Sequence, residues 1–247
     1  MGKTSISANV SILLSQIGKK AILVDSDIAM ANVGIVLGIE SAPISLQNVL
    51  AGENAVSDAV YEGPAKIKYV PAGLSMDAAK KVDFSRFAPA IAELEKTADF
   101  IIIDCPPGME PNTATVIKSA KEILIVVTPD PPSLADGLKV RQFASKHGIK
   151  TAGVVVNRFR GSPDEVRVSE IETLIGNKVL AVIPEDPEMR RSIERQSPLM
   201  LGNQGTPAGL ALKKLAILIS GEKIEAIPSK GGIFQRIIEA LFGRKNQ

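Results

Sequence analysis

Hydrophobic residues along this chain alternate between short continuous runs and longer segments with helical periodicity. The continuous runs are rich in β-branched residues and cover Ala21–Val24, Ile67–Val70, Phe100–Ile103, Ile123–Val127, Gly153–Val156 and Val179–Ile183. Uninterrupted apolar runs of this length are typical of parallel strands that are covered on both faces. The pattern therefore predicts a buried, mostly parallel sheet.

Segments with helical periodicity separate these runs, near residues 4–17, 85–97, 112–120, 133–147, 164–175 and 207–219. Ser85 and Ser133 suit helix N-caps, and Gly18 and Gly148 stand where helices are expected to end. The alternation predicts an α/β fold with a doubly wound, mostly parallel sheet flanked by helices, and sites at the carboxyl ends of its strands. We expect one domain over residues 1–220, a polar linker over 221–231 and a C-terminal helix over 232–247.

The C-terminal segment carries an apolar pattern of its own. Its large apolar residues recur at helical spacing and are Ile233, Phe234, Ile237, Ile238, Leu241 and Phe242. They form one broad stripe, with polar residues opposite and with Arg244 and Lys245 after it. A detached amphipathic helix with basic ends is typical of a segment that lies in a membrane interface. A last helix packed on the protein's own core is the alternative, and the pattern favours the membrane.

Composition narrows the classes of function. The chain has 247 residues, 45% of them hydrophobic, which is enough for a full α/β core in one domain. A net charge of +2 and the absence of tryptophan argue against nucleic acid as the main partner. The single cysteine, Cys105, excludes an intrachain disulfide and a cysteine pair for a metal. No signal peptide and no apolar run of about 18 residues is present, so we expect a cytoplasmic protein that does not span a membrane.

Candidate chemistry begins at the first residues. Gly2-Lys3-Thr4 matches the second half of the phosphate-binding loop G-x-x-x-x-G-K-[ST]. The triplet alone occurs by chance in roughly one chain in ten of this length. However, Asp25 and Asp27 follow one predicted strand, and Asp104 follows another. Bound ATP requires a lysine on its phosphates, a hydroxyl on Mg²⁺ and carboxylates nearby. Each aspartate taken singly could merely cap a turn, but the combination predicts a site for ATP and Mg²⁺.

Several longer stretches together match one known family. They are GKTSISANVSILLSQIGKKAILVDSDIAMANVGIVLG, ISLQNVLAGE, VPAG, FIIIDCPPG, GVVVNR and VIPEDPEMRRS. Through them the chain resembles the MinD/ParA family of deviant P-loop ATPases, especially its archaeal MinD-type members, over nearly its whole length. The resemblance implies an ATP-hydrolysing switch that forms a homodimer with ATP and attaches peripherally to the inner face of the cell membrane. Such a switch positions cell-division or other cellular components through a protein cargo or activator that the sequence does not identify.

The resemblance also implies roles for residues on the phosphate side of the site. Lys3 would bind phosphate and assist catalysis, Thr4 would bind Mg²⁺, and Asp27 would activate water. Asp104 would lie near the metal, which makes Thr4, Asp27 and Asp104 the implied metal set. The loop residues that would contact the cofactor are Gly2, Lys3, Thr4 and Ser5.

Further implied roles concern the moving segments and the base. Asn32 and Gly108 would lie in the two switch segments, and Asn157 would read the adenine edge, with Arg158 beside it. The loop that would pack against the base consists of Pro184, Glu185 and Asp186.

One departure from the family is plain. The family's loop reads K-G-G-x-G-K-[ST], and Met1 takes the x position, so the first strand and the signature lysine are not in this sequence. We expect an internal valine codon taken as a start, with a real truncation or a degenerate relative as the alternatives. Because the strand is central in the family's sheet, its loss would leave two neighbouring strands unpaired and the chain loosely folded.

Other functions fit parts of the sequence. A nucleotide-sensing pseudo-ATPase would use occupancy instead of turnover to regulate a partner. A ParA-type DNA segregation ATPase is a second alternative, which the charge and the C-terminal stripe disfavour. An iron–sulfur carrier of the same superfamily would need a cysteine pair. Cys105 itself is expected to be a small buried hydrophobe, because no histidine is placed to activate it.

Overall fold

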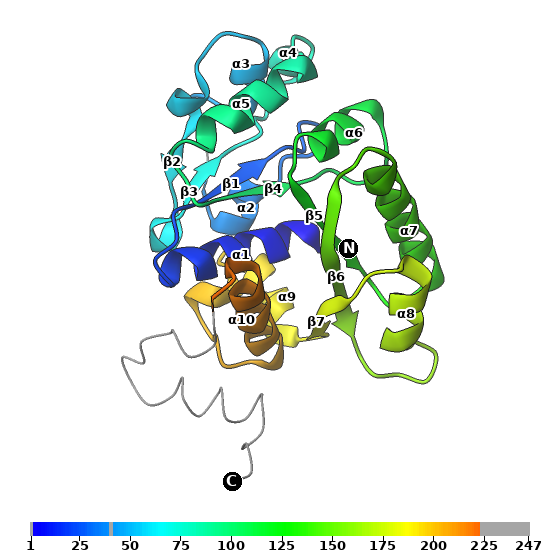
Figure 1. Cartoon of the computed structure of the whole chain (residues 1–247). Coiled ribbons are helices and arrows are strands. Elements are labelled where there is room, and N and C mark those ends of the chain that lie inside the picture. Colours follow the sequence, from blue (N-terminus) through cyan, green and yellow to red (C-terminus); the bar gives the residue numbers. More distant parts are fainter. Residues whose placement is uncertain (1, 40–41, 223–247) are drawn as a thin grey trace.

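The computed structural model describes residues 2–39 and 42–222 and places helices on both faces of two β-sheets (Figure 1). The strands are β1 (Ala21–Asp25), β2 (Tyr61–Glu62), β3 (Lys68–Val70), β4 (Phe100–Asp104), β5 (Glu122–Val127), β6 (Lys150–Phe159) and β7 (Val179–Pro184). The α-helices are α1 (Lys3–Gln16), α2 (Val33–Leu37), α3 (Leu46–Leu50), α4 (Met76–Ala79), α5 (Phe87–Leu94), α6 (Pro111–Lys118), α7 (Pro131–Lys146), α8 (Val168–Ile175), α9 (Pro187–Glu194) and α10 (Pro207–Ser220).

Every continuous apolar run of the sequence forms a strand. The four-stranded sheet has the order β2-β3-β1-β4, and the three-stranded sheet has the order β5-β6-β7. All of their pairings are parallel except that of the short β2 with β3, which the sequence pattern did not predict. The predicted α/β class with a mostly parallel, helix-flanked sheet is confirmed.

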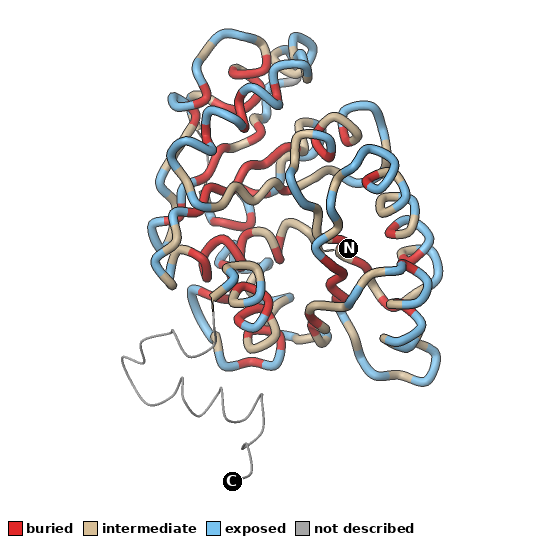
Figure 2. The backbone as a smooth tube through the Cα atoms, viewed as in Figure 1, coloured by how far each residue is buried: buried red, intermediate tan, exposed pale blue. Residues whose placement is uncertain are grey.

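The division into two sheets is the main difference from a single doubly wound sheet. Among the described residues, β4 is the last strand of one sheet and β5 the first of the other, and no hydrogen-bonded pairing joins them. Figure 1 shows these two strands toward the middle of the molecule. The expectation that two strands would be left unpaired is therefore met at β4 and β5. The residues of β4 and β5 are mostly only half-buried, whereas all of β1 is buried (Figure 2).

Alternate residues of each strand enter different cores, as the two-residue period of a strand requires. In β1, Leu23 packs under α1, while Ile22 and Val24 pack against α3 and α5. In β6, Val155 joins the first of these cores, while Val154 and Val156 pack against α7 and α8. The core beneath α1 and α10 thus extends under both sheets, whereas the opposite faces of the two sheets have separate cores.

The helix ends correct two of the predicted N-caps. Ser85 and Ser133 lie inside the first turns, and their backbone N–H groups donate to Asp83 Oδ1 at 2.9 Å and Asp130 Oδ1 at 3.0 Å. The aspartates are the actual caps, because an acceptor placed two or three residues before a free N–H reaches it best. The predicted helix ends are confirmed, since Gly18 and Gly148 both adopt a positive φ just after α1 and α7.

The predicted C-terminal helix and its six apolar residues, Ile233, Phe234, Ile237, Ile238, Leu241 and Phe242, lie outside the described residues, as does most of the predicted linker. Within residues 2–39 and 42–222, no helix is both long and apolar enough to cross a membrane.

Candidate functional site

The first turn of α1 begins at a glycine that tolerates no side chain. Gly2 has a φ of 96°, and a Cβ there would lie 2.4 Å from the side-chain amide nitrogen of Asn157. Gly2 has no side chain with which to cap the first N–H groups of α1, and these groups have no acceptor within the helix. A helix start with open N–H groups and a close-lying backbone suits an anion such as a phosphate. Ser5, one of the predicted contact residues, is buried in this turn.

Asp104 lies at the carboxyl end of β4, facing this turn. Its side chain is buried, and Oδ1 accepts a hydrogen bond from Ser7 Oγ at 3.2 Å. Burial raises the pKa of Asp104, while hydrogen bonds from Thr4 and Ser7 and the charge of Lys3 act in the opposite direction. The structure therefore brings together Lys3, Thr4 and Asp104, as the sequence predicted. Asp27 is also near enough for its charge to raise the pKa of Asp104.

Asp25, which the sequence analysis left without a role, holds the segment that carries Asp27. It ends β1, directly beside Asp104 in the strand register, and only 1% of it is exposed. Burial raises its pKa to about 7, against the effect of three backbone N–H groups that donate to it, while the charge of Asp104 adds to the rise. A buried carboxylate at this position is a candidate functional residue in its own right.

The two predicted switch residues lie in loops that follow β1 and β4. Asn32 is the residue before α2, and its side-chain amide donates to the carbonyl of Met30 at 2.6 Å. Gly108 is exposed, has a φ of 81°, and has no atoms near its Cβ position. Asn32 is linked to the site through its N–H, which donates to Asp25 Oδ2 at 3.1 Å, and Gly108 lies in the loop that follows Asp104. A switch role of either residue stays a prediction.

The residues predicted to contact the base gather at the ends of β6 and β7. Asn157 is buried against Gly2, whereas Arg158 is exposed with a φ of 56°. The N–H of Glu185 donates to the carbonyl of Phe159 at 2.9 Å, which joins the two strand ends beside Pro184. Contact of these residues with a base stays a prediction.

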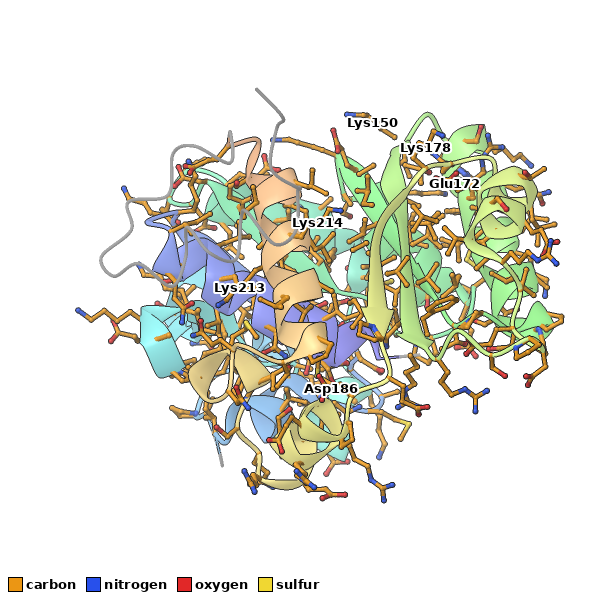
Figure 3. All side chains as sticks on the ribbon, turned by 90° about the horizontal axis from the view of Figure 1, so that it is seen from below. Lys150, Glu172, Lys178, Asp186, Lys213 and Lys214 are labelled. Atoms are coloured by element: carbon orange, nitrogen blue, oxygen red, sulfur yellow. The ribbon has the colours of Figure 1, made fainter. Side chains whose placement is uncertain are left out.

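Asp186 has a structural task that the sequence did not reveal. Its carboxylate accepts the N–H of Glu188 at 2.9 Å and the N–H of Ala208 at 3.1 Å, and so caps α9 and also holds the start of α10. Figure 3 labels Asp186 between these two helices, just after the end of β7, whereas Lys178 lies at the start of that strand. Its oxygens already have partners, so its predicted contact with a base competes with these bonds.

Sequence reasoning missed Ser7 at the site, and it named Asp25 at the strand end without giving it a role of its own. Ser7 follows Thr4 by three residues, a spacing that puts both on one face of a helix, and this was the available signal. For Asp25 the only signal was its place at the strand end. Cys105, predicted to be a small buried hydrophobe, is half-buried and packs against the core that contains α3 and α5. Burial raises the pKa of its thiol to about 12.

The oxygen donors at the site suit a hard cation that takes only a few of its ligands from the protein. Within the described ranges, no group of three or more histidine, cysteine or acidic residues could hold a metal by itself. A hydroxyl from Thr4 and one or two carboxylates nearby leave positions for water and phosphate oxygens. That arrangement is the one Mg²⁺ prefers, and it does not suit a metal that needs a full protein cage.

The fold and the site define a nucleotide-binding protein of the P-loop class. The family model described as "CobQ/CobB/MinD/ParA nucleotide binding domain" matches residues 1–199, and the chain belongs to this family of ATPases.

Similar proteins agree with this assignment. An uncharacterised ATP-binding protein of Methanocaldococcus jannaschii is 35% identical over 99% of this chain and 93% of the relative. The crystal structure of the cell division ATPase MinD of Pyrococcus furiosus has a TM-score of 0.86 at 33% identity, over 89% of this chain and 93% of that one. MinD of Pyrococcus horikoshii, solved in complex with Mg-ADP, has a TM-score of 0.85 at 31% identity, over 93% of this chain and 94% of that one.

Proposed function

We propose that this chain is an ATP-hydrolysing switch of the MinD type, which binds ATP with Mg²⁺ and forms a homodimer when ATP is bound. The observation that carries the proposal is the meeting of Lys3, Thr4 and Asp104 at the open start of α1, with the segment of Asp27 beside them. Lys3 neutralises phosphate charge, and Thr4 and Asp104 supply the oxygens for the metal. Bound Mg²⁺ would neutralise charge on the phosphate oxygens. Asp27 is the carboxylate that orients the attacking water.

Two substitutions separate binding from hydrolysis. Lys3→Ala should abolish ATP binding, because it removes the positive charge at the phosphates, and a fluorescent ATP analogue measures this directly. Asp27→Ala should leave the affinity for ATP within about twofold and lower turnover by about 10²-fold, the size of a typical general-base contribution. Phosphate release measures turnover.

Matched controls are available on the surface of α7. Lys139 and Asp136 form an exposed ion pair 3.2 Å apart, and Lys139→Ala and Asp136→Ala should leave binding and turnover unchanged. Unchanged ATP affinity in Lys3→Ala would refute the phosphate site. A wild-type rate in Asp27→Ala would refute its role, and binding without any turnover in the unaltered chain would favour the nucleotide-sensing alternative.

The proposal includes peripheral attachment to the membrane through residues 232–247, in the service of positioning cell-division or other cellular components. Its support is the apolar stripe of the sequence and the membership of the family. One such helix binds weakly, since the cost of ordering it offsets most of the apolar gain. Two tails on an ATP-bound dimer act together, which can strengthen attachment about 10²–10⁴-fold.

Sedimentation with vesicles that contain anionic lipid tests the attachment. The chain should sediment with vesicles in ATP and much less in ADP, and Ile237→Glu should abolish sedimentation in both states while ATP binding persists. Equal sedimentation in ATP and ADP would exclude the coupling to nucleotide. Unchanged sedimentation of Ile237→Glu would exclude the anchor.

A further inference from the structure

The side chain of Asp25 binds both ends of the segment that connects β1 to α2. Oδ1 accepts the N–H of Asp27 at 3.1 Å, and Oδ2 accepts the N–H groups of Asn32 at 3.1 Å and Val33 at 3.0 Å. One carboxylate therefore binds the first residues and the last residues of the segment 26–33. With three donors on two oxygens, a carboxyl group is the side chain that fits, since an amide has only one acceptor oxygen.

These bonds also supply the cap of α2. The residue before this helix, Asn32, makes no side-chain bond to the free N–H groups of the first turn. Asp25 takes that part from the end of the neighbouring strand, since it accepts the N–H of Val33. The start of α2 is thus fixed to β1 and not to its own loop.

The other end of the segment is fixed to β4. Ser26 donates twice to the carbonyl of Asp104, from its N–H at 3.1 Å and from Oγ at 2.7 Å. Between these attachments, Asp27 Oδ1 accepts the N–H of Met30 at 3.0 Å. The backbone around Asp27 is consequently held at both ends, by the bonds of Ser26 to Asp104 and by the three N–H groups that donate to Asp25.

We propose that Asp25 is a positioning residue for the hydrolytic step: by binding the backbone N–H groups of Asp27, Asn32 and Val33, it holds Asp27 in the place where water is oriented. The proposal rests on the proposed function and deepens it. It assigns to Asp25 no contact with nucleotide or water. Its loss should therefore affect turnover through Asp27 and leave ATP affinity, which depends on Lys3 and the start of α1, nearly unchanged.

The experiment compares Asp25→Asn with the unaltered chain and with Asp83→Asn. Asp83 is a matched control, because it also caps a short helix by accepting a backbone N–H, at 2.9 Å, but lies away from the site. We expect turnover of Asp25→Asn to fall by about tenfold or more with ATP affinity within about twofold. Combining Asp25→Asn with Asp27→Ala should cost no more turnover than Asp27→Ala alone, because both act through one group.

A second readout does not depend on turnover. Amide hydrogen exchange of a peptide covering 26–34 should speed up in Asp25→Asn, while peptides from α7 and α10 keep their protection. Asp83→Asn should change exchange only near residues 84–86 and should hydrolyse ATP at the wild-type rate.

The outcomes are distinct. Normal turnover of Asp25→Asn, or additive losses in the double variant, would overturn the proposal. Unchanged exchange at 26–34 would overturn it as well, and so would a loss of ATP affinity as large as the loss of turnover. Lack of hydrolysis in the unaltered chain would refute the proposed function instead, and the exchange readout would then decide whether Asp25 holds the segment.

Discussion

At the scale of the residue, the site places two buried carboxylates side by side. Asp25 and Asp104 are register partners at the ends of β1 and β4, and both have a raised pKa for which burial is the largest cause. Burying an acidic group costs free energy whenever the group is ionised. The hydrogen bonds that Asp25 and Asp104 accept offset part of this cost. The bonds to Asp25 also hold the loop between β1 and α2 in place.

The first prediction concerns pH and stability. The pKa of Asp25 is about 7 in the folded chain against 3.8 for an unperturbed aspartate. Between these two values the folded chain holds a proton that the unfolded chain releases, so the contribution of Asp25 to the free energy of unfolding should fall as pH rises from about 4 to 7, by about 4 kcal/mol at most. Asp104 contributes in the same direction. Carboxylates with a lowered pKa, such as Asp83 and Asp130, contribute in the opposite direction.

Urea unfolding at several pH values between 5 and 8 measures this dependence. In Asp25→Asn the contribution of Asp25 is absent, so stability should fall less, or rise more, with pH than in the unaltered chain. An identical pH dependence in both chains would show that the pKa of Asp25 is not raised.

At the scale of the element, the strength of each local pattern explains which predictions were right. The apolar run Ala21–Val24 lies in a fully buried strand, and its burial favours the strand that the pattern predicts. The helices α2, α3, α4 and α9 were not predicted. The first three have only four or five residues, too few to show helical periodicity, and α9 is mostly polar. In addition, α2 takes a cap from outside its own loop, from Asp25 at the end of β1. Lys3, Thr4 and Asp104 could be predicted because strand ends and a helix start meet at one edge. The role of Asp25 could not be predicted, since its hydrogen-bond partners depend on the path of the loop between β1 and α2.

The second prediction concerns Asp186 and α10. Asp186→Ala removes the acceptor for Glu188 and Ala208, and each bond to a charged group contributes about 1.5–3 kcal/mol. Unfolding in urea should show a loss of about 2–4 kcal/mol, and hydrogen exchange should speed up at the starts of both α9 and α10. Asp130→Ala, which removes the cap of α7 alone, is the control. If only α9 loosened, Asp186 would not hold α10.

At the scale of the whole molecule, the main feature is that the two sheets are not joined by strand pairing in the described part of the chain. β4 and β5 each have one edge without a strand partner among the described residues. An unpaired edge leaves backbone N–H groups free to exchange with water or to pair with another chain. A strand that filled such a place would add several hydrogen bonds of about 1 kcal/mol each, together with its buried side chains.

The third prediction follows from these edges. Amides of β1 and β6, which are paired on both sides, should exchange slowly, whereas roughly every second amide of β4 and β5 should exchange much faster. The chain should also unfold with low cooperativity and tend to aggregate. Equal protection of β1 and β4, together with a sharp cooperative melt, would show that the sheets are joined in solution.

The same separation changes what a bound nucleotide would do. The residues proposed for the phosphates and the metal lie at the start of α1 and the ends of β1 and β4, whereas those proposed for the base lie at the ends of β6 and β7. A molecule that spans both would tether two sheets that share no strand pairing. Tethering stabilises by mass action, by about 2.7 kcal/mol when the free ligand is at 100 times its dissociation constant. The nucleotide would then act as a structural part of this protein, and the free energy that holds the two sheets together would increase with its concentration.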